Sequence, residues 1–283
     1  MTMLHSKTVD ASVHPARMLN AGADEMDVTA AIAHFREHGY ARLGKVASDD
    51  TIEALRTRAE DIMLGRVVYP NLFFQIDGTT GRYDKLTYGR GYEGPSLNYR
   101  KIEKLEQDPL YLAWIENPLF ERIARTIILG DIVIYRALLF SKARKAENGD
   151  PGGTVLPWHQ DGGKFWGLDR DPLLQVWTAL DDTPVASGCV EVFPGSHLFG
   201  LATPLGGVVQ ERLVDHKEAN AQATPLPVRA GDVLLIHNHV WHRSGVNTTD
   251  TARRAFTVCY MTAQTRCLRT KKAPRTFFPV FRG

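Results

Sequence analysis

The segment 157–163 places a histidine and an aspartate two positions apart, His159 and Asp161. In an extended strand, side chains at positions i and i+2 project from the same face, so both can reach one metal ion. One further histidine would complete the set of two histidines and one carboxylate that holds non-haem Fe(II) and leaves three positions open. The pair alone is not specific, because His216 and Glu218 have the same spacing.

Three histidines lie near the end of a second β-rich run and are candidates for the third ligand. His237 and His239 share a face within the run, whereas His242 lies past its end, where a loop can turn it toward a metal. Geometry alone leaves all three open and slightly favours His242. A buried histidine bonded to the backbone is the commoner situation, and it is our interpretation of His237 and His239.

Two adjacent arginines, Arg253 and Arg254, begin the apolar run 255–260. A guanidinium that enters a buried strand must be paired, because an unpaired buried charge is costly. Its natural partner is a carboxylate held through two parallel hydrogen bonds. Neighbouring strand residues point to opposite faces, so only one of the two arginines can face the same cavity as the metal. A solvent-exposed arginine pair is the alternative interpretation.

The elements that would position these residues change in type along the chain. Apolar spacing predicts helices over 27–39 and 48–63, and one or two more within 96–130. Short runs rich in β-branched and aromatic residues follow, separated by Gly, Pro, Asp and Asn. They cover 132–142, 156–161, 173–180, 189–193, 232–239 and 254–262. This order predicts an α+β protein whose β part is a sandwich or barrel, with the jelly-roll among the candidates.

The near-neutral net charge argues against partners that bind a strongly charged protein surface. The chain has 34 basic and 32 acidic residues, a net charge of +2. We therefore expect no nucleic acid and no membrane as partner, and a small-molecule substrate instead. The oligomeric state is left open.

The ends of the chain and its cysteines complete the expected domain organisation. Residues 1–26 contain no apolar run long enough for a signal peptide or a membrane span, and we interpret them as a flexible, cytoplasmic N-terminus. Residues 27–283 are expected to form a single catalytic domain with a helical N-terminal part. Three cysteines are too few for a disulfide framework, which fits a reducing compartment.

Several motifs, taken together and in order, resemble the phytanoyl-CoA dioxygenase family. That family includes ectoine hydroxylase and many enzymes of secondary metabolism. The resemblance covers roughly 99–260. The motifs are WHQD at 158–161, VWTAL at 176–180, GCVEVFPGSH at 188–197, GDVLLIH at 231–237, and His242-x-Ser244-x-x-Asn247 with Arg253.

The resemblance implies a double-stranded β-helix (jelly-roll) core with N-terminal helices packed on it, using Fe(II), 2-oxoglutarate and O2. It implies His159, Asp161 and His242 as the iron ligands. Arg253 rather than Arg254 would hold the far carboxylate of 2-oxoglutarate, because the family's arginine falls eleven residues after the distal histidine. Four further residues match positions that contact the cosubstrate in relatives, namely Trp177, Ser244, Gln160 and Lys101.

The resemblance also implies a reaction class. The enzyme would oxidise an unactivated C–H bond and release succinate and CO2. Related halogenases have a small residue where this chain has Asp161, so the carboxylate favours a hydroxylase, with desaturation, cyclisation and epimerisation still open. The substrate is expected to be a small polar metabolite. The candidate substrate-binding residues are Trp166, Lys164 and Arg170.

Three alternatives compete with this interpretation. A basic C-terminal run could clamp the phosphates of a coenzyme A thioester, which would make the protein an acyl-CoA 2-hydroxylase. A non-catalytic, cupin-like module could bind a structural metal, although such a zinc site usually has four protein ligands. An Fe(II) dioxygenase without 2-oxoglutarate would leave Arg253 without a task. The basic run consists of Arg266, Arg269, Lys271, Lys272 and Arg275.

Overall fold

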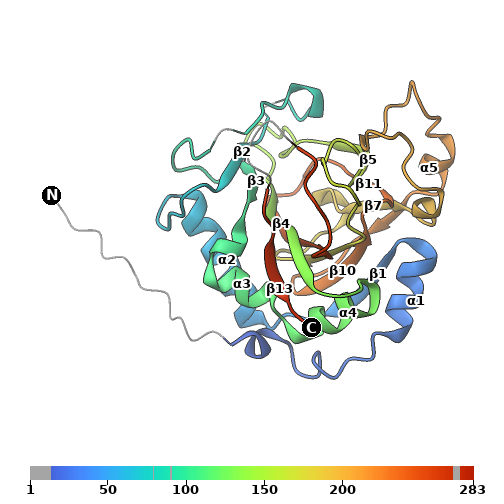
Figure 1. Ribbon diagram of the computed structural model, residues 1–283. Coiled ribbons are helices and arrows are strands. Elements are labelled where there is room, and N and C mark those ends of the chain that lie inside the picture. The colour runs from blue at the N-terminus through green and yellow to red at the C-terminus, as the bar shows by residue number, and fades with distance from the viewer. Residues whose placement is uncertain (1–13, 79, 90, 270–274) are drawn as a thin grey trace.

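Two antiparallel sheets with helices on the outer side of the larger one form the architecture (Figure 1). The structure is a computed structural model that describes residues 14–78, 80–89, 91–269 and 275–283. Within these residues the strands form two separate sheets and not one closed barrel. The prediction of an α+β jelly-roll with N-terminal helices is confirmed.

The strands of each sheet come from distant parts of the chain. The larger sheet has the order β1 (Tyr40–Lys45), β10 (Asp232–His237), β6 (Leu174–Ala179), β12 (Arg253–Thr262), β4 (Ile132–Lys142), β3 (Tyr99–Glu103) and β2 (Phe73–Ile76), with β13 (Phe278–Phe281) also paired to β4. The smaller sheet has the order β8 (Gly207–Val208), β5 (Leu156–Gln160), β11 (Trp241–Ser244), β7 (Val190–Phe193) and β9 (Thr224–Leu226).

Strand alternation separates the two faces of the larger sheet. On β12, Phe256, Val258 and Tyr260 belong to the apolar core shared with the helices. The residues between them face the other way, toward the smaller sheet. Arg253 on that face opposes Lys142 of β4, and Cys259 opposes both Arg136 of β4 and Gln175 of β6. The candidate functional residues therefore lie on the inner face of the larger sheet, and the outer face of that sheet packs against the helices.

The helices begin and end at the signals expected of them. Ser48 caps α2 by accepting a hydrogen bond from the Thr51 N–H, and Gly39 ends α1 in the left-handed conformation. Asp108 caps α3 and forms a buried ion pair with Arg58. The helices are α1 (Thr29–His38), α2 (Asp49–Met63), α3 (Pro109–Ile115), α4 (Pro118–Ile127) and α5 (Lys217–Ala221), with short 3₁₀ turns at η1 (Pro15–Met18), η2 (Tyr83–Lys85), η3 (Leu105–Gln107), η4 (Val185–Ser187) and η5 (Ser196–Phe199).

Two expectations from the sequence need correction. The start of the segment predicted as helical, 96–130, instead forms β3, because its residues find an open edge of β4 to pair with. The N-terminal segment predicted as flexible is partly ordered: Met18 is buried, and its carbonyl accepts a hydrogen bond from the Thr51 hydroxyl. Residues 1–13 of that segment lie outside the described residues.

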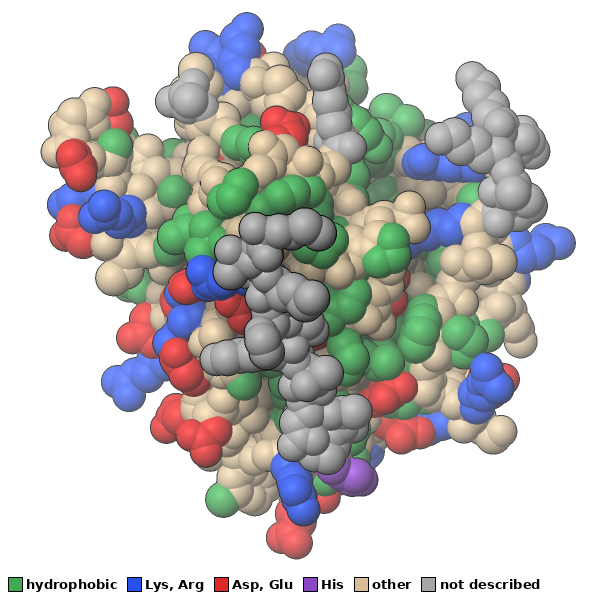
Figure 2. All heavy atoms as spheres, turned by 90° about the vertical axis from the view of Figure 1, so that its left-hand side faces the viewer, with side chains coloured by type: hydrophobic (Ala, Val, Ile, Leu, Met, Phe, Trp, Pro, Cys, Tyr) green, Lys and Arg blue, Asp and Glu red, His purple; other side chains and the backbone are tan. Residues whose placement is uncertain are grey.

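The surface shows no gathering of one sign of charge on the face seen in Figure 2. Lysine, arginine and acidic side chains alternate there around a band of apolar groups, as the near-neutral net charge suggests. Among the described residues, no helix has the length and apolar character needed to cross a membrane.

The hydroxyl of Tyr260 ties β12 to the helical layer. It donates a hydrogen bond of 2.6 Å to the carbonyl of Ile115, and the side chain is fully buried. We expect Tyr260→Phe to lower the free energy of unfolding by about 1–3 kcal/mol, because the buried carbonyl loses its donor. Urea unfolding measures this loss, and the m-value should be unchanged. A loss below about 0.5 kcal/mol, the range of surface substitutions, would contradict the prediction.

Candidate metal centre

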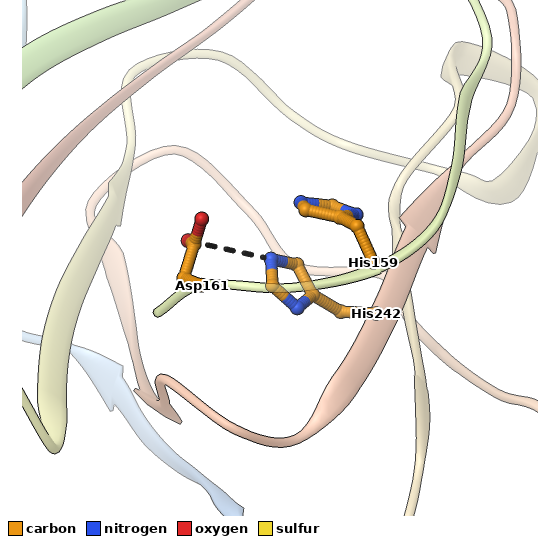
Figure 3. Close-up of side chains that lie close together, drawn as sticks. All are labelled: His159, Asp161 and His242. Carbon is orange, nitrogen blue, oxygen red and sulfur yellow. Dashed lines mark ion pairs between the residues drawn. The ribbon is translucent and has the colours of Figure 1, made fainter. Parts of the chain in front are cut away.

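The smaller sheet brings His159, Asp161 and His242 together. His159 is on β5, Asp161 follows that strand directly, and His242 is on the neighbouring β11 in register with His159. Figure 3 shows the three side chains converging on one point. Each offers one ligand atom, and these atoms lie within 4.8 Å of one another. The structure thus selects His242 among the three histidines that geometry had left open.

Both histidines are oriented by their backbone neighbours. Nδ1 of His159 lies 2.9 Å from the carbonyl of Pro157, and Nδ1 of His242 lies 2.9 Å from that of Val240. A carbonyl partner at Nδ1 leaves Nε2 of each ring as the metal-binding atom. Burial and the nearby His242 lower the pKa of His159 to about 3. The imidazole of His159 is therefore neutral at physiological pH, the form that binds a metal.

The two oxygens of Asp161 have different partners. Oδ1 accepts a hydrogen bond of 3.0 Å from Nη2 of Arg136, whereas Oδ2 accepts one of 2.8 Å from Gln175 and lies 3.8 Å from Nε2 of His242. Burial alone would raise the pKa of Asp161, but Arg136 and the two histidines lower it to about 2. The group is a carboxylate with its charge opposed by an arginine.

Arg136 is held in place on its other sides. Its guanidinium carbon lies 4.4 Å from the ring centre of Trp166, which stacks on Tyr135 with ring centres 4.3 Å apart. Nη1 lies 4.0 Å from Oε1 of Glu103, and Glu103 is paired with Lys101. A row of alternating charges thus leads from β3 across β4 to the metal ligand.

A cavity of about 180 Å³ is lined by His159, Asp161 and His242 and also by Arg253. The Arg253 side chain is buried, and Nη2 donates a hydrogen bond of 2.6 Å to the carbonyl of Gly188. Gly188 has a φ of +69°, and a Cβ there would lie 2.4 Å from the carbonyl oxygen of Gly245, so only glycine fits. Among the described residues, Nε of Arg253 has no hydrogen-bond partner.

A second buried cation faces Arg253. Lys142 stands opposite it in the β4–β12 register, and its ammonium group donates to the carbonyl of Thr154. Burial, Arg253 and Arg100 lower the pKa of Lys142 well below its usual range, and burial lowers the pKa of Arg253 to about 10. Two carboxylates act in the opposite direction, Asp77 on the pKa of Lys142 and Asp181 on that of Arg253. Two like charges opposed in this way repel each other, and a bound anion would lessen the repulsion.

Four of the other predicted contact residues line this cavity: Trp177, Ser244, Lys101 and Trp166. Gln160 does not. It faces away from the metal because it lies between His159 and Asp161, and its amide bonds the backbone of Gly200, Ala202 and His239. This placement gives no support for Gln160 as a cosubstrate contact.

Lys164 and Arg170 are not among the residues that line this cavity, so the prediction that they contact substrate gains no support from it. Both line a separate surface depression. Arg170 is half-exposed, and its charged end lies beside Asp169 and Gln264. They follow Asp161 closely in sequence, but it is Phe165 and Trp166, between them, that line the cavity.

Two of the other candidate histidines, His237 and His239, have hydrogen-bond partners outside the group of three. Nδ1 of His237 accepts the backbone N–H of His239, and Nε2 of His239 lies 2.9 Å from Oδ2 of Asp171. The ring of His216 lies 5.7 Å from that of Trp241, away from the three ligands.

The described residues of the basic C-terminal run are engaged by the protein. Arg266 pairs with Asp169, Arg269 donates to the carbonyl of Phe165, and Arg275 donates to the carbonyl of Tyr135. Lys271 and Lys272 lie outside the described residues.

Sequence reasoning missed Arg136, Lys142 and Gln175. Arg136 and Lys142 interrupt an otherwise apolar strand, six positions apart and therefore on one face. A charged residue inside a buried strand requires a partner, so the two charges in this apolar run could have indicated a site. Gln175 gave none, because its role depends on the distant Asp161.

The donor set fits non-haem iron better than structural zinc. It consists of two imidazoles and one carboxylate, and among the described residues no fourth His, Cys, Asp or Glu joins the group. A closed zinc site has four protein ligands, whereas an iron oxygenase site keeps open positions. The cavity on the open side provides room for ligands at those positions.

Comparisons of sequence identify the family of the chain. Residues 35–255 match the family described as Phytanoyl-CoA dioxygenase (PhyH). A Danio rerio protein named Phytanoyl-CoA dioxygenase domain-containing protein 1 is 26% identical over 82% of this chain and 89% of its own length. Its Bos taurus counterpart is 29% identical, with 54% of its length matched. The Arabidopsis thaliana protein named Phytanoyl-CoA dioxygenase is 24% identical over 79% of this chain and 85% of its own.

Solved structures share the fold. EctD from S. alaskensis, with 2-oxoglutarate and 5-hydroxyectoine, is 19% identical with a TM-score of 0.68, over 99% of this chain and 92% of that chain. The α-ketoglutarate-dependent carbocyclase SnoK from nogalamycin biosynthesis is 22% identical with a TM-score of 0.66, over 92% and 98%. The family match, from residue 35 to residue 255, spans most of the sequence. The chain therefore belongs to the phytanoyl-CoA dioxygenase (PhyH) family.

Proposed function

We propose that the protein is an Fe(II)- and 2-oxoglutarate-dependent dioxygenase that hydroxylates an unactivated C–H bond of a small polar metabolite. The observation that carries this proposal is that one cavity is lined by two different groups of side chains. The three side chains that could hold a metal line it, and so does the buried Arg253, whose Nε has no partner among the described residues. A dicarboxylate with a keto group is a ligand that would satisfy both groups.

Each residue would have one task. His159, Asp161 and His242 would hold the iron. Arg253 would accept the far carboxylate of 2-oxoglutarate, and the opposed Lys142 would gain an anion in its neighbourhood. When bound, iron and 2-oxoglutarate supply the oxidation of a C–H bond, with succinate and CO2 as co-products. The protein's own part is to orient the two small molecules and to exclude water.

The remaining wall residues would shape the cosubstrate and substrate positions. Trp177, Ser244 and Lys101 line the cavity and remain candidate cosubstrate contacts, while Trp166 remains a candidate substrate wall. Charged side chains that hold neither the metal nor the cosubstrate in this proposal, among them Asp77 and Arg100, also line the cavity and could contact polar groups of a substrate. Asp161 occupies the place that a halide would need, which supports hydroxylation over halogenation.

The acyl-CoA alternative receives support from the names of relatives, among them the Arabidopsis thaliana protein. The basic run offers it less, because Arg266, Arg269 and Arg275 are already engaged by protein groups. Adding coenzyme A esters and following 2-oxoglutarate consumption separates the two alternatives. Stimulation by one of these esters would replace the small polar metabolite by an acyl-CoA.

Anaerobic titration tests the proposed function directly. Fe(II) and 2-oxoglutarate together should give the visible charge-transfer band of an iron–keto acid chelate, and neither alone should. A non-catalytic module that seals its metal, or a dioxygenase that does not use 2-oxoglutarate, would give no band. Absence of the band with metal bound would therefore overturn the proposal.

A further inference from the structure

The carboxylate of Asp161 is held from two sides by side chains that the function proposed above does not use. Arg136 donates to Oδ1 at 3.0 Å, and Gln175 donates to Oδ2 at 2.8 Å. Oδ2 is also the oxygen that faces the histidines, 3.8 Å from Nε2 of His242. The two oxygens are thus already distinguished by the protein: Oδ1 contacts Arg136, and Oδ2 is on the side of His242, to which Asp161 is joined by the dashed line in Figure 3.

We propose that Arg136 is a positioning residue that makes Asp161 a ligand through one oxygen only. This inference rests on the proposed function, because it concerns the iron ligand set. Arg136 engages Oδ1 by a charge-assisted hydrogen bond and leaves Oδ2 to the metal. Gln175 fixes the carboxylate plane from the other side.

The number of oxygens matters because positions around the metal are few. Two histidines and one carboxylate oxygen leave three positions, which a keto acid and O2 require. A carboxylate that binds through both oxygens takes one of these positions away. A guanidinium on Oδ1 opposes that second bond, since the oxygen would have to exchange a charged partner for the metal.

Arg136 itself is built into the site rigidly enough to act this way. Trp166 covers one face of its guanidinium, with the guanidinium carbon 4.4 Å from the ring centre, and Glu103 lies 4.0 Å from Nη1. Its backbone is in the middle of β4, opposite Cys259 of β12. A side chain restrained on three sides keeps its donor directed at one acceptor, which is what orientation of a metal ligand requires.

Charge alone predicts the opposite effect on the metal. A cation beside the site repels Fe(II), so removing it should tighten metal binding if Arg136 acts only through its charge. If Arg136 acts by orienting Asp161, its removal should loosen both the metal and the keto acid. The direction of the change in Fe(II) affinity therefore separates the two roles.

The test compares Arg136→Met with Arg136→Lys under anaerobic conditions. Methionine fills similar space without a donor, and lysine retains both the charge and a donor. We expect Arg136→Met to weaken Fe(II) binding about 10–100-fold, the usual effect of losing the outer partner of a metal ligand. We also expect weaker 2-oxoglutarate binding and a displaced charge-transfer band. Arg136→Lys should recover a large part of both affinities.

Arg254→Met is the control. Arg254 pairs with Asp181, which is not one of the three candidate ligands, and it is not among the residues that line the cavity. Its Fe(II) affinity should stay near that of the unmodified protein. Glu103→Gln, which weakens the outer support without touching Asp161, should give a smaller loss than Arg136→Met.

Each outcome has a definite meaning. Unchanged or tighter Fe(II) binding by a folded Arg136→Met protein would overturn the inference, as would equal behaviour of the methionine and lysine variants. Thermal unfolding of every variant checks that folding is retained, and Arg136→Lys serves where methionine is not tolerated. Failure of the unmodified protein to form the iron–keto acid band would instead count against the proposed function.

Discussion

Asp161→Ala is expected to abolish the charge-transfer band and to lower 2-oxoglutarate turnover by more than about a thousandfold. Losing an outer partner of a ligand already costs about 10–100-fold, and losing the ligand itself should cost more. Alanine also leaves Arg136 without its nearest carboxylate, since Glu103 lies 4.0 Å from Nη1. Anaerobic Fe(II) titration followed by the visible spectrum measures the first effect, and succinate formation measures the second.

Two further variants separate metal loss from unfolding. Asp161→Asn keeps the shape of the side chain but removes its negative charge, and it should lose most of the band while remaining folded. Asp171→Asn alters another aspartate that contacts a histidine, at 2.9 Å from His239, outside the cavity. A band of full intensity in Asp161→Ala would rule out Asp161 as a ligand, and an equal loss in Asp171→Asn would point to a general effect on folding.

Much of the fold was predictable because its signals are local. Helical spacing and a Ser48 cap predicted α2, and short runs rich in β-branched and aromatic residues predicted β4, β10 and β12. The start of the 96–130 segment was assigned wrongly because β3 depends on an edge of β4 that no local pattern describes. Pairing partners far apart in sequence override local preference.

The candidate site was likewise predictable only in part. His159 and Asp161 follow from spacing within one strand, whereas the choice of His242 depends on the register between β5 and β11. Geometry from the sequence left three histidines open, and only the resemblance to a family singled out one. The positions of Arg136 and Gln175 around Asp161 were not accessible, because they arise where two sheets meet.

Some of the predicted contact residues do not line the cavity, for a physical reason. Lys164 and Arg170 follow Asp161 closely in sequence, yet they line a separate depression, while Phe165 and Trp166 between them line the cavity. Gln160 fails for a simpler reason, since strand alternation directs it away from its neighbours His159 and Asp161. A residue that is close in sequence to the candidate metal ligands does not necessarily point into the same cavity.

Arg253→Leu should raise the dissociation constant of 2-oxoglutarate by about a hundredfold, equivalent to about 2.7 kcal/mol. Arg253 is buried and lines the cavity, opposite Lys142, and its Nε has no partner among the described residues. A carboxylate at this point would gain charge-assisted hydrogen bonds from a donor that is already desolvated. Fe(II) affinity should be retained, because Arg253 does not contact the three ligands.

The control is the neighbouring arginine. Arg254 points to the opposite face, where it pairs with Asp181 and Glu60. Arg254→Gln should lower stability, since a partly buried ion pair is lost, but it should leave the affinity for 2-oxoglutarate unchanged. Equal losses of affinity in both variants would indicate a general disturbance of β12 and not a missing anchor.

A ligand without the far carboxylate distinguishes a direct contact from an indirect one. In the unmodified protein, 2-oxopentanoate should bind much more weakly than 2-oxoglutarate, because it has the same chain length but nothing to offer Arg253. In Arg253→Leu the two keto acids should bind alike, since the residue that separates them is gone. A preference for 2-oxoglutarate that persists undiminished in the variant would place the anchor elsewhere, with the opposed Lys142 as the first residue to replace next.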